Sequence, residues 1–542
     1  MGGRLRLTAR KTPRAAKTAR GVFLPWVRFR LGEDCGKIGA VDHPGREDLG
    51  LRKERTGLNK TVLYLIYFCI YSAALLLIGK SSLRDNRTVS SYFTCDRKVS
   101  LPLCICTFAG TWLSAITILS LTGGVYEDGL AVLFYSVVPW FLGGFLLAGA
   151  SRRLYRKDVI TVPELFGKQY GSLGLQVAFG IIFILIYIFY LVSQYKGFGM
   201  VASALFDIPY PVAVLMVYLF ILYTTFGGYR SVVRTDAFNL TLLTLGLLVL
   251  FVLIVGKVGG FGSLYQQAAQ ISGAAHPGVA SPTQTGDLLR LFNSRYTPLI
   301  SLSMFWGWGL GLAANPQYTI RMLCAPDSTT ARRTVLGALA LLALLYFALV
   351  HIGLGMRVLV PHLSGVTSSD EVIIRLLNEE LYSGWSGFFL FSIIGACVST
   401  ANSQLLLIAS SFSYDVVGTL SKQKISQRRI LGLGRLAVFG GGTISMLMAL
   451  DPPNFTLSYG GDVWGAVSVL VFPPMYGALF SRRITRRGVW ACIITGAVAI
   501  LVLYPLYYLG TLTIHPALPG MVISTAVMVL VSLLDRKRGA AQ

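Results

Sequence analysis

Long apolar segments recur along the whole chain and limit what it can fold into. Each is about 20 residues long, enough for a helix to cross about 30 Å of hydrocarbon, and short polar loops separate them. Of the 542 residues, 54% are hydrophobic and only 13% are charged, too few charges to cover a soluble surface of this size. Apolar runs this long also exclude a β-barrel, whose strands alternate over about 10 residues. The sequence therefore predicts one all-α membrane domain in a lipid bilayer.

Thirteen membrane spans are predicted from these segments. Their approximate bounds are 61–79, 101–121, 129–150, 172–203, 212–229, 236–256, 298–320, 334–358, 386–412, 430–450, 462–480, 488–508 and 516–534. Together they form one transmembrane domain over residues 61–534. We expect a basic, disordered tail at 1–60 and a short cytoplasmic tail at 535–542.

The net charge of +24 is distributed in a regular way. Loops after odd-numbered spans are basic, as in the loop with Arg321, Arg332 and Arg333, whereas loops after even-numbered spans carry almost no Lys or Arg. Because loop Lys and Arg mark the cytoplasmic side, we expect a plasma-membrane protein. The N-terminus of its first span would lie outside and its C-terminus inside. Basic residues confined to loops and the N-terminus argue against nucleic acid as a partner.

The N-terminal tail does not fit this rule, because it is strongly basic yet would lie outside. It has no compact apolar stretch followed by a small-residue cleavage site, so a secretory signal is not expected. Either translation starts later than Met1, or the tail resists export and the first span is unusual. Cys104 and Cys106 form the one close pair of cysteines, which is a weak metal signal without partner ligands, and we expect them to be buried thiols.

Small and hydroxyl-bearing residues share one face in each of two spans: Gly110, Ser114 and Thr117 in span two, and Ala396, Ser399 and Ser403 in span nine. Small residues let transmembrane helices approach closely, so helix packing is one explanation. Coordination of Na⁺ is the other, because a hard cation prefers oxygen ligands. Discontinuous membrane helices supply such ligands as freed backbone carbonyls.

Span seven contains a run of weak helix formers. Gly307, Gly309 and Gly311 alternate with apolar residues, and Asn315-Pro316 follows. Glycines this dense predict an interruption near the membrane midplane. The alternative is a glycine-rich packing face.

Lys196 is the charged residue that lies deepest in a predicted span. It is eleven residues before Asp207, about 16 Å at the rise of a helix. A charge at such depth usually faces the protein interior, where it could bind a substrate carboxylate or take the place of a second cation. Alternatively, span four ends early and Lys196 snorkels outward.

Two motifs resemble those of the sodium:solute symporter family. The first is Tyr223-Thr224-Thr225-Phe226-Gly227-Gly228-Tyr229-Arg230-Ser231, followed by Thr235-Asp236, and it looks like the family's signature after its fifth span. The second is Ser399-Thr400-x-x-Ser403-Gln404-Leu405-Leu406, closing with Asp415, and it is similar to the signature of the ninth span. The resemblance covers about 60–534. It implies a five-plus-five inverted-repeat core with discontinuous helices, in which spans two to six are repeated upside down by spans seven to eleven.

The resemblance also implies a sodium site and the outline of a substrate site. The sodium ligands would be the backbone carbonyls of Gly110, Leu113 and Ala396 and the hydroxyls of Ser399 and Thr400. Tentative substrate residues are Ser114, Lys196, Trp308 and Leu312. The proline branch of the family carries a tyrosine where Leu312 stands and a carboxylate where Trp112 stands. His515-Pro516 and Pro519 look as much like the pantothenate branch. Both solutes carry a carboxylate.

We therefore expect a sodium-coupled symporter that imports a small carboxylate-bearing solute by alternating access, with Na⁺ as the coupling ion. The alternative is a membrane sensor without transport, or a proton-coupled carrier, on the same bundle. Few carboxylates lie within the spans to relay protons. We expect no enzyme, because there is no G-x-x-x-x-G-K-[ST] phosphate loop and no apparent Ser/His/Asp set. The substrate's identity, the ion stoichiometry and the oligomeric state stay open.

Overall fold

A computed structural model describes residues 46–540, apart from 81–87, 226–227, 276–278, 280–281, 364–365, 382, 384, 422–424 and 453–455. Within these residues the chain is built of helices, with a single isolated β-bridge between Gly273 and Thr283. Helices suit these sequences because they satisfy every backbone polar group within the segment, as a bilayer requires. Residues 1–45 of the predicted tail lie outside the described part. The first helix, α1 (Arg46–Lys80), begins earlier than the predicted span.

Most predicted spans correspond to one helix each. These helices are α1, α7 (Leu173–Phe206), α8 (Tyr210–Thr225), α9 (Gly228–Val258), α13 (Ser328–Leu359), α16 (Gln427–Ala449), α19 (Arg486–Tyr508) and α20 (Ala517–Ala540). Two further spans continue into or out of a π-helical turn: η4 (Leu133–Val137) with α5 (Val138–Tyr155), and α15 (Ser386–Ser410) with η8 (Ser411–Gly418). The predicted tail at 535–542 is helical as far as Ala540.

Local capping sets several of the helix starts. Thr161 and Ser172 accept hydrogen bonds from backbone N–H groups at the starts of α6 (Val162–Tyr170) and α7. Asp327 does the same for two N–H groups of α13. Each side chain replaces a partner that the first turn of a helix lacks. Helix α7 ends at Asp207, which lies in the left-handed region with a φ of 52°.

Two spans are sharply bent. Helix α3 (Leu101–Trp112) gives way after Trp112 to η3 (Ile116–Ser120) and α4 (Leu121–Asp128), with a bend of 61°. Helices α17 (Thr456–Leu470) and α18 (Phe472–Phe480) meet at 42°. Among the described residues, nine helices are long and apolar enough to cross a membrane, or up to eleven if each bent pair is one span. The other two predicted spans are the short α8 and the pair α11 (Pro298–Ala313) and α12 (Pro316–Leu323). The count of thirteen therefore stays a prediction.

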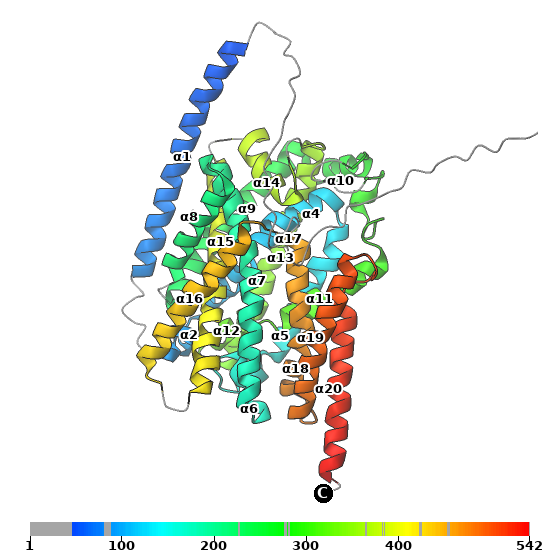
Figure 1. Ribbon diagram of the computed structural model, residues 1–542. Coiled ribbons are helices and arrows are strands. Elements are labelled where there is room, and N and C mark those ends of the chain that lie inside the picture. Colours follow the sequence, from blue (N-terminus) through cyan, green and yellow to red (C-terminus); the bar gives the residue numbers. More distant parts are fainter. Residues whose placement is uncertain are drawn as a thin grey trace, which may run out of the picture.

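The bundle has two distinct ends (Figure 1). Helix α6, α2 (Val89–Thr94) and the C-terminal end of α20 lie at one end, and α10 (Gly260–Gln270) and α14 (Val372–Arg375) lie at the other. The short helices η2 (Cys95–Arg97), η5 (Asp287–Leu289), η6 (Ser369–Glu371) and η7 (Leu376–Glu380) complete the chain. Arg152 and Arg153 in the last turn of α5, and Arg156 and Lys157 just after it, belong to the end that carries α6.

The glycines of span seven pack against neighbouring helices and do not interrupt their own. Helix α11 runs unbroken through Gly307, Gly309 and Gly311. A Cβ at Gly311 would overlap the carbonyl oxygen of Trp464 in α17, and one at Gly309 would lie 2.9 Å from that of Pro139 in α5. Span seven is therefore interrupted within the predicted run of weak helix formers, but not at its glycines. The helix breaks instead at Ala314 and Asn315, because Asn315 caps the start of α12 just before Pro316.

Helix α15 forms the centre of the bundle. It packs against α7, α9 and α16, and the membrane-spanning part of its length is buried throughout. It is one continuous helix, so of the two polar spans singled out in the sequence only span two is interrupted. A central helix needs no lipid-facing stripe, which is why Ser, Thr, Asn and Gln can stand among its apolar residues.

Candidate functional site

The interruption of α3 exposes backbone oxygens in the middle of the bundle. Leu113 leaves the helix with φ −78° and ψ 100°, and the helical path resumes at Ala115, whose N–H donates to Gln194 Oε1 of α7 at 3.2 Å. The carbonyl of Thr111 accepts a bond from Gln317, and that of Trp112 accepts one from Thr117. Within the described residues, the carbonyls of Gly110 and Leu113 accept none. These two oxygens are available to a ligand.

The hydroxyls of α15 lie directly opposite this break. Thr400 Oγ1 donates to the Thr111 carbonyl at 3.3 Å. Ser399 Oγ is 3.5 Å from the place where a Cβ on Gly110 would lie, an ordinary van der Waals distance, so α3 and α15 pack closely here. Ala396 lies one turn before Thr400 on the same buried helix. Of the five predicted sodium ligands, the structure thus places Thr400 against the carbonyl of Thr111 at the break, and Ser399 beside Gly110.

A buried ion pair adjoins these hydroxyls. Asp236 of α9 accepts hydrogen bonds from Ser399 at 2.6 Å and from Thr107 of α3 at 2.5 Å. Its Oδ2 atom also lies 3.4 Å from Nη2 of Arg321, and neither side chain is exposed to solvent. A carboxylate and a guanidinium buried together satisfy each other's charge, whereas either alone would be costly.

Arg321 holds several elements together from this position. Its guanidinium donates to the Thr107 carbonyl at 2.9 Å, to the Gln317 carbonyl at 2.7 Å and to the Ser403 hydroxyl of α15. It also lies 5.5 Å from the centre of the Tyr229 ring. The loop charge count placed Arg321 among the basic surface residues, and this was wrong, because α12 turns the side chain into the bundle.

Asp236, Gln194 and Gln317 were not predicted as site residues. Asp236 stood within the first family motif, and a carboxylate beside a predicted membrane span is a signal that could have marked it. The two glutamines gave no such signal. Their role follows from the break in α3, since Gln194 holds the N–H of Ala115 and Gln317 holds the carbonyl of Thr111.

The predicted substrate residues lie on both sides of the break. Ser114 is inside the interruption itself and is buried beside the Tyr190 hydroxyl. Trp308 is buried on α11, and its ring rests against Gly460 and Gly461 of α17. Gly460 in turn contacts Ile116, the first residue of η3. Leu312 is also buried and packs against Gly143 of α5.

Lys196 does not snorkel outward. Its Nζ lies 2.6 Å from Oδ2 of Asp370 in η6, with the lysine side chain 7% exposed and the aspartate 1%. The same Asp370 oxygen accepts the N–H and the hydroxyl of Thr456 at the start of α17. The segment around η6 packs tightly against α4, because a Cβ on Gly123 of α4 would overlap the carbonyl of Ser369. Lys196 thus joins α7 to the η6 segment and α17.

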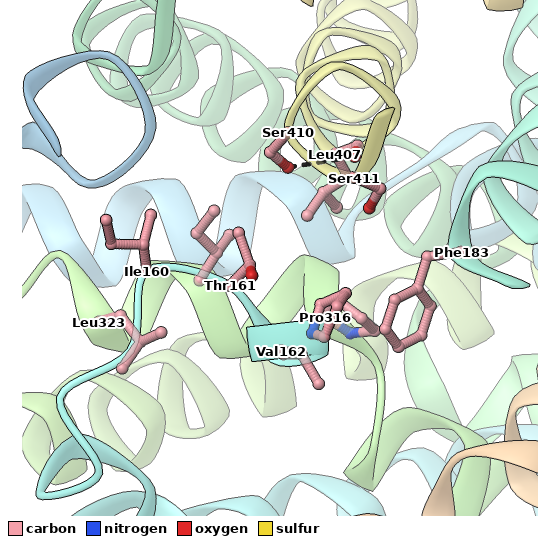
Figure 2. A pocket seen from close by; sticks show the side chains of 11 residues that line it. Ile160, Thr161, Val162, Phe183, Pro316, Leu323, Leu407, Ser410 and Ser411 are labelled. Carbon is pink, nitrogen blue, oxygen red and sulfur yellow. Dashed lines mark hydrogen bonds between the residues drawn. The ribbon is translucent and has the colours of Figure 1, made fainter. Parts of the chain in front are cut away.

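A small cavity opens between α6, α12 and α15, toward the end of the bundle that carries α6 (Figure 2). Apolar side chains such as Val162, Phe183 and Pro316 form much of its wall, with hydroxyls from Thr161, Ser410 and Ser411 among them. Thr161 also donates to Oδ1 of Asp415 at 2.6 Å, and Gln176 donates to the same oxygen at 3.0 Å. Asp415 is fully buried, and its second oxygen has no hydrogen-bond partner among the described residues.

Comparison with known proteins finds relatives along nearly the whole chain. The model of the sodium:solute symporter family matches residues 92–496. A sodium/proline symporter of Staphylococcus aureus is 23% identical over 493 residues, which cover 88% of this chain and 93% of that protein. Another, from strain USA300, is 24% identical over 494 residues with the same coverage.

Two kinds of solved transporter share the fold. A Na⁺-coupled sialic acid symporter, in a substrate-bound outward-open state, has a TM-score of 0.71 at 18% identity and covers 87% of this chain and 97% of its own. Mhp1, a nucleobase-cation-symport-1 family transporter in a closed conformation, has a TM-score of 0.56 at 14% identity. It covers 84% of this chain and 96% of its own.

Proposed function

The chain belongs to the sodium:solute symporter family, and from this membership we propose that it imports a small carboxylate-bearing solute by alternating access. Sodium-coupled membrane transport is the activity of that family, with Na⁺ as the coupling ion, and the protein is a multi-pass membrane transporter and not an enzyme. The proposal adds the chemical class of the solute, the direction of transport and the residues that hold the ion.

One observation carries the proposed sodium site. The carbonyl oxygens of Gly110 and Leu113 accept no hydrogen bond from the described residues, and the hydroxyl-bearing residues Ser399 and Thr400 of α15 lie beside the same break in α3. Oxygen ligands from an interrupted helix and a neighbouring hydroxyl-bearing helix are what a desolvated Na⁺ requires. The carbonyl of Ala396 would complete the set of five.

The ion would couple to the solute through the break in α3. Ser114 and Trp112 are part of the interruption or adjoin it, and Trp308 reaches it from α11. Sodium bound to Gly110 and Leu113 would fix the break in one conformation and so order the residues that contact the solute. A ligand that orders a segment lowers the cost of binding the next one. The solute would therefore bind more tightly once sodium is in place.

The charge of the loops and the membership of the family support the remaining features of the proposed architecture. We propose thirteen spans, an inverted repeat of five plus five, and a plasma-membrane location with the α6 end of the bundle in the cytoplasm. Under this orientation the Lys196–Asp370 pair lies toward the outside and the cavity at Thr161 lies toward the cytoplasm.

Uptake by purified protein in proteoliposomes tests the proposal. We expect accumulation of radiolabelled L-proline or another small carboxylate only when an inward Na⁺ gradient is imposed. Replacing Ser399 and Thr400 together by Ala should lower the apparent sodium affinity strongly. Ser392→Ala is the matched control. Ser392 is a buried serine of the same helix, and its hydroxyl donates to the carbonyl of Phe389, one turn earlier in α15.

Three outcomes would count against the proposal in different ways. Uptake driven equally well by a proton gradient without sodium would replace it by a proton-coupled carrier. Binding without uptake would favour a sensor. Unchanged sodium dependence in the double variant would show that Ser399 and Thr400 of α15 do not bind the ion.

A further inference from the structure

Three buried tryptophans, Trp140, Trp308 and Trp464, have indole N–H groups without a hydrogen-bond acceptor among the described residues. Trp464 lies beside the Tyr190 hydroxyl, which can serve as its acceptor, so Trp140 and Trp308 are the two whose acceptor is missing. Trp140 of α5 is 3% exposed and Trp308 of α11 is 2% exposed, and neither Nε1 atom has a partner among the described residues. An indole nitrogen can only donate, so the missing group in each case is an acceptor. The neighbouring Trp112 shows the usual arrangement, since its N–H donates to the Tyr346 hydroxyl at 3.0 Å.

The two tryptophans belong to one aromatic cage at the break in α3. Their ring centres lie 5.0 Å apart in an edge-to-face arrangement. The surrounding rings come from five different helices, and their centres lie 5.0–5.9 Å from a neighbour in the cage: Trp112, Tyr190, Tyr318, Tyr346 and Trp464. Aromatic faces attract alkylated ammonium groups as well as hydrocarbon.

Two buried cations on the helices around the cage already face carboxylates. Lys196 of α7 lies 2.6 Å from Asp370, and Arg321 of α12 lies 3.4 Å from Asp236. A solute carboxylate in the cage would therefore bind to indole N–H donors, because these two basic side chains are already paired with carboxylates.

We propose that the N–H groups of Trp140 and Trp308 bind the carboxylate of the transported solute, and that the rings around them hold an alkylated ammonium group. The solute class is thus a compact zwitterion that carries both groups. This inference rests on the proposed transport function and adds Trp140, which sequence motifs did not indicate, and Trp464 as a ring of the cage.

Matched ligands test the inference directly. Glycine betaine and choline share a trimethylammonium group but differ in the carboxylate, and L-proline and L-prolinamide differ in the same way. We expect the full-length protein in detergent with Na⁺ to bind the carboxylate member of each pair more tightly. Trp140→Phe and Trp308→Phe keep a ring and remove the N–H. Each should weaken binding of the carboxylate member about tenfold, or about 1.4 kcal/mol, and leave its partner's affinity nearly unchanged. Trp490→Phe, at a half-buried site on α19, is the control.

The outcomes separate this inference from the proposed function. Equal losses for both members of a pair would mean that the tryptophans shape the cage without recognising the carboxylate, and would overturn the inference. So would wild-type protein that binds none of the carboxylates. Thermal stabilisation by Na⁺ without any solute is measured on the same samples. If it persists in both Phe variants while their carboxylate preference is unchanged, the indole inference fails and the sodium site stands. If wild type shows no sodium stabilisation, the proposed coupling fails.

Discussion

The buried pair of Lys196 and Asp370 allows a quantitative prediction. Its atoms lie 2.6 Å apart with side-chain exposures of 7% and 1%, so water cannot replace either partner. Removing one member of such a pair leaves a buried charge without its counterpart, which costs about 3–5 kcal/mol. We expect Lys196→Met to lower the free energy of unfolding by about 3 kcal/mol, at the low end of this range. The reason is that Asp370 keeps the N–H and hydroxyl of Thr456 as hydrogen-bond donors.

A double-mutant cycle isolates the interaction. Asp370→Asn keeps an oxygen for Thr456 but removes the charge that faces Lys196. The variant with both changes has no buried charge at this position, so it should recover about 2 kcal/mol or more relative to the sum of the single changes. The assay is unfolding of purified protein in mixed detergent, followed by the fluorescence of its tryptophans, with Na⁺-driven uptake measured in parallel.

An exposed ion pair provides the control for this cycle. Arg487 and Asp535 lie 2.6 Å apart, but the arginine is 72% exposed. Arg487→Met with Asp535→Asn should show a coupling below about 1 kcal/mol. If the Lys196 pair gives a coupling as small as this control, the ammonium is solvated and its assignment to the bundle interior is refuted.

Three further predictions concern packing and buried polar groups. Gly311→Ala should lower the unfolding temperature and abolish uptake, because its Cβ would overlap the Trp464 carbonyl and force α11 and α17 apart at a cost of about 1–3 kcal/mol or more; Gly149→Ala, with open space around it, should not. Arg321→Lys should also reduce stability and uptake, because an ammonium group cannot make the three hydrogen bonds that the guanidinium makes to Thr107, Gln317 and Ser403. A variant as stable as the wild type would show that a positive charge alone is sufficient at this position. Asp415→Asn should retain stability because it keeps an acceptor for Thr161 and Gln176, whereas Asp415→Leu should lose about 1–3 kcal/mol by leaving both donors unpaired; equal losses for Asn and Leu would show that the negative charge is required.

The sequence alone predicted the helices, the family and the break in α3. Hydrophobic length decides which segments can cross a bilayer, and this information is local to each segment. The family motifs also marked Ser399 and Thr400, and the comparisons confirm the membership. The stripe of Gly110 and Ser114 indicated where this helix is interrupted. Glycine is a weak helix former, and a hydroxyl side chain can replace a lost backbone hydrogen bond within the membrane.

Tertiary structure decided how the polar side chains are paired. Lys196 and Asp370 are 174 residues apart, and Arg321 and Asp236 are 85 apart, so no local pattern could pair them. The glycines of span seven looked like an interruption, yet they are close-packing positions against α5 and α17. Composition reports the conformational freedom of a glycine but not whether a neighbouring backbone has taken up the space. Local hydrophobicity therefore determines which helices form, and their packing determines which buried charges and donors find partners.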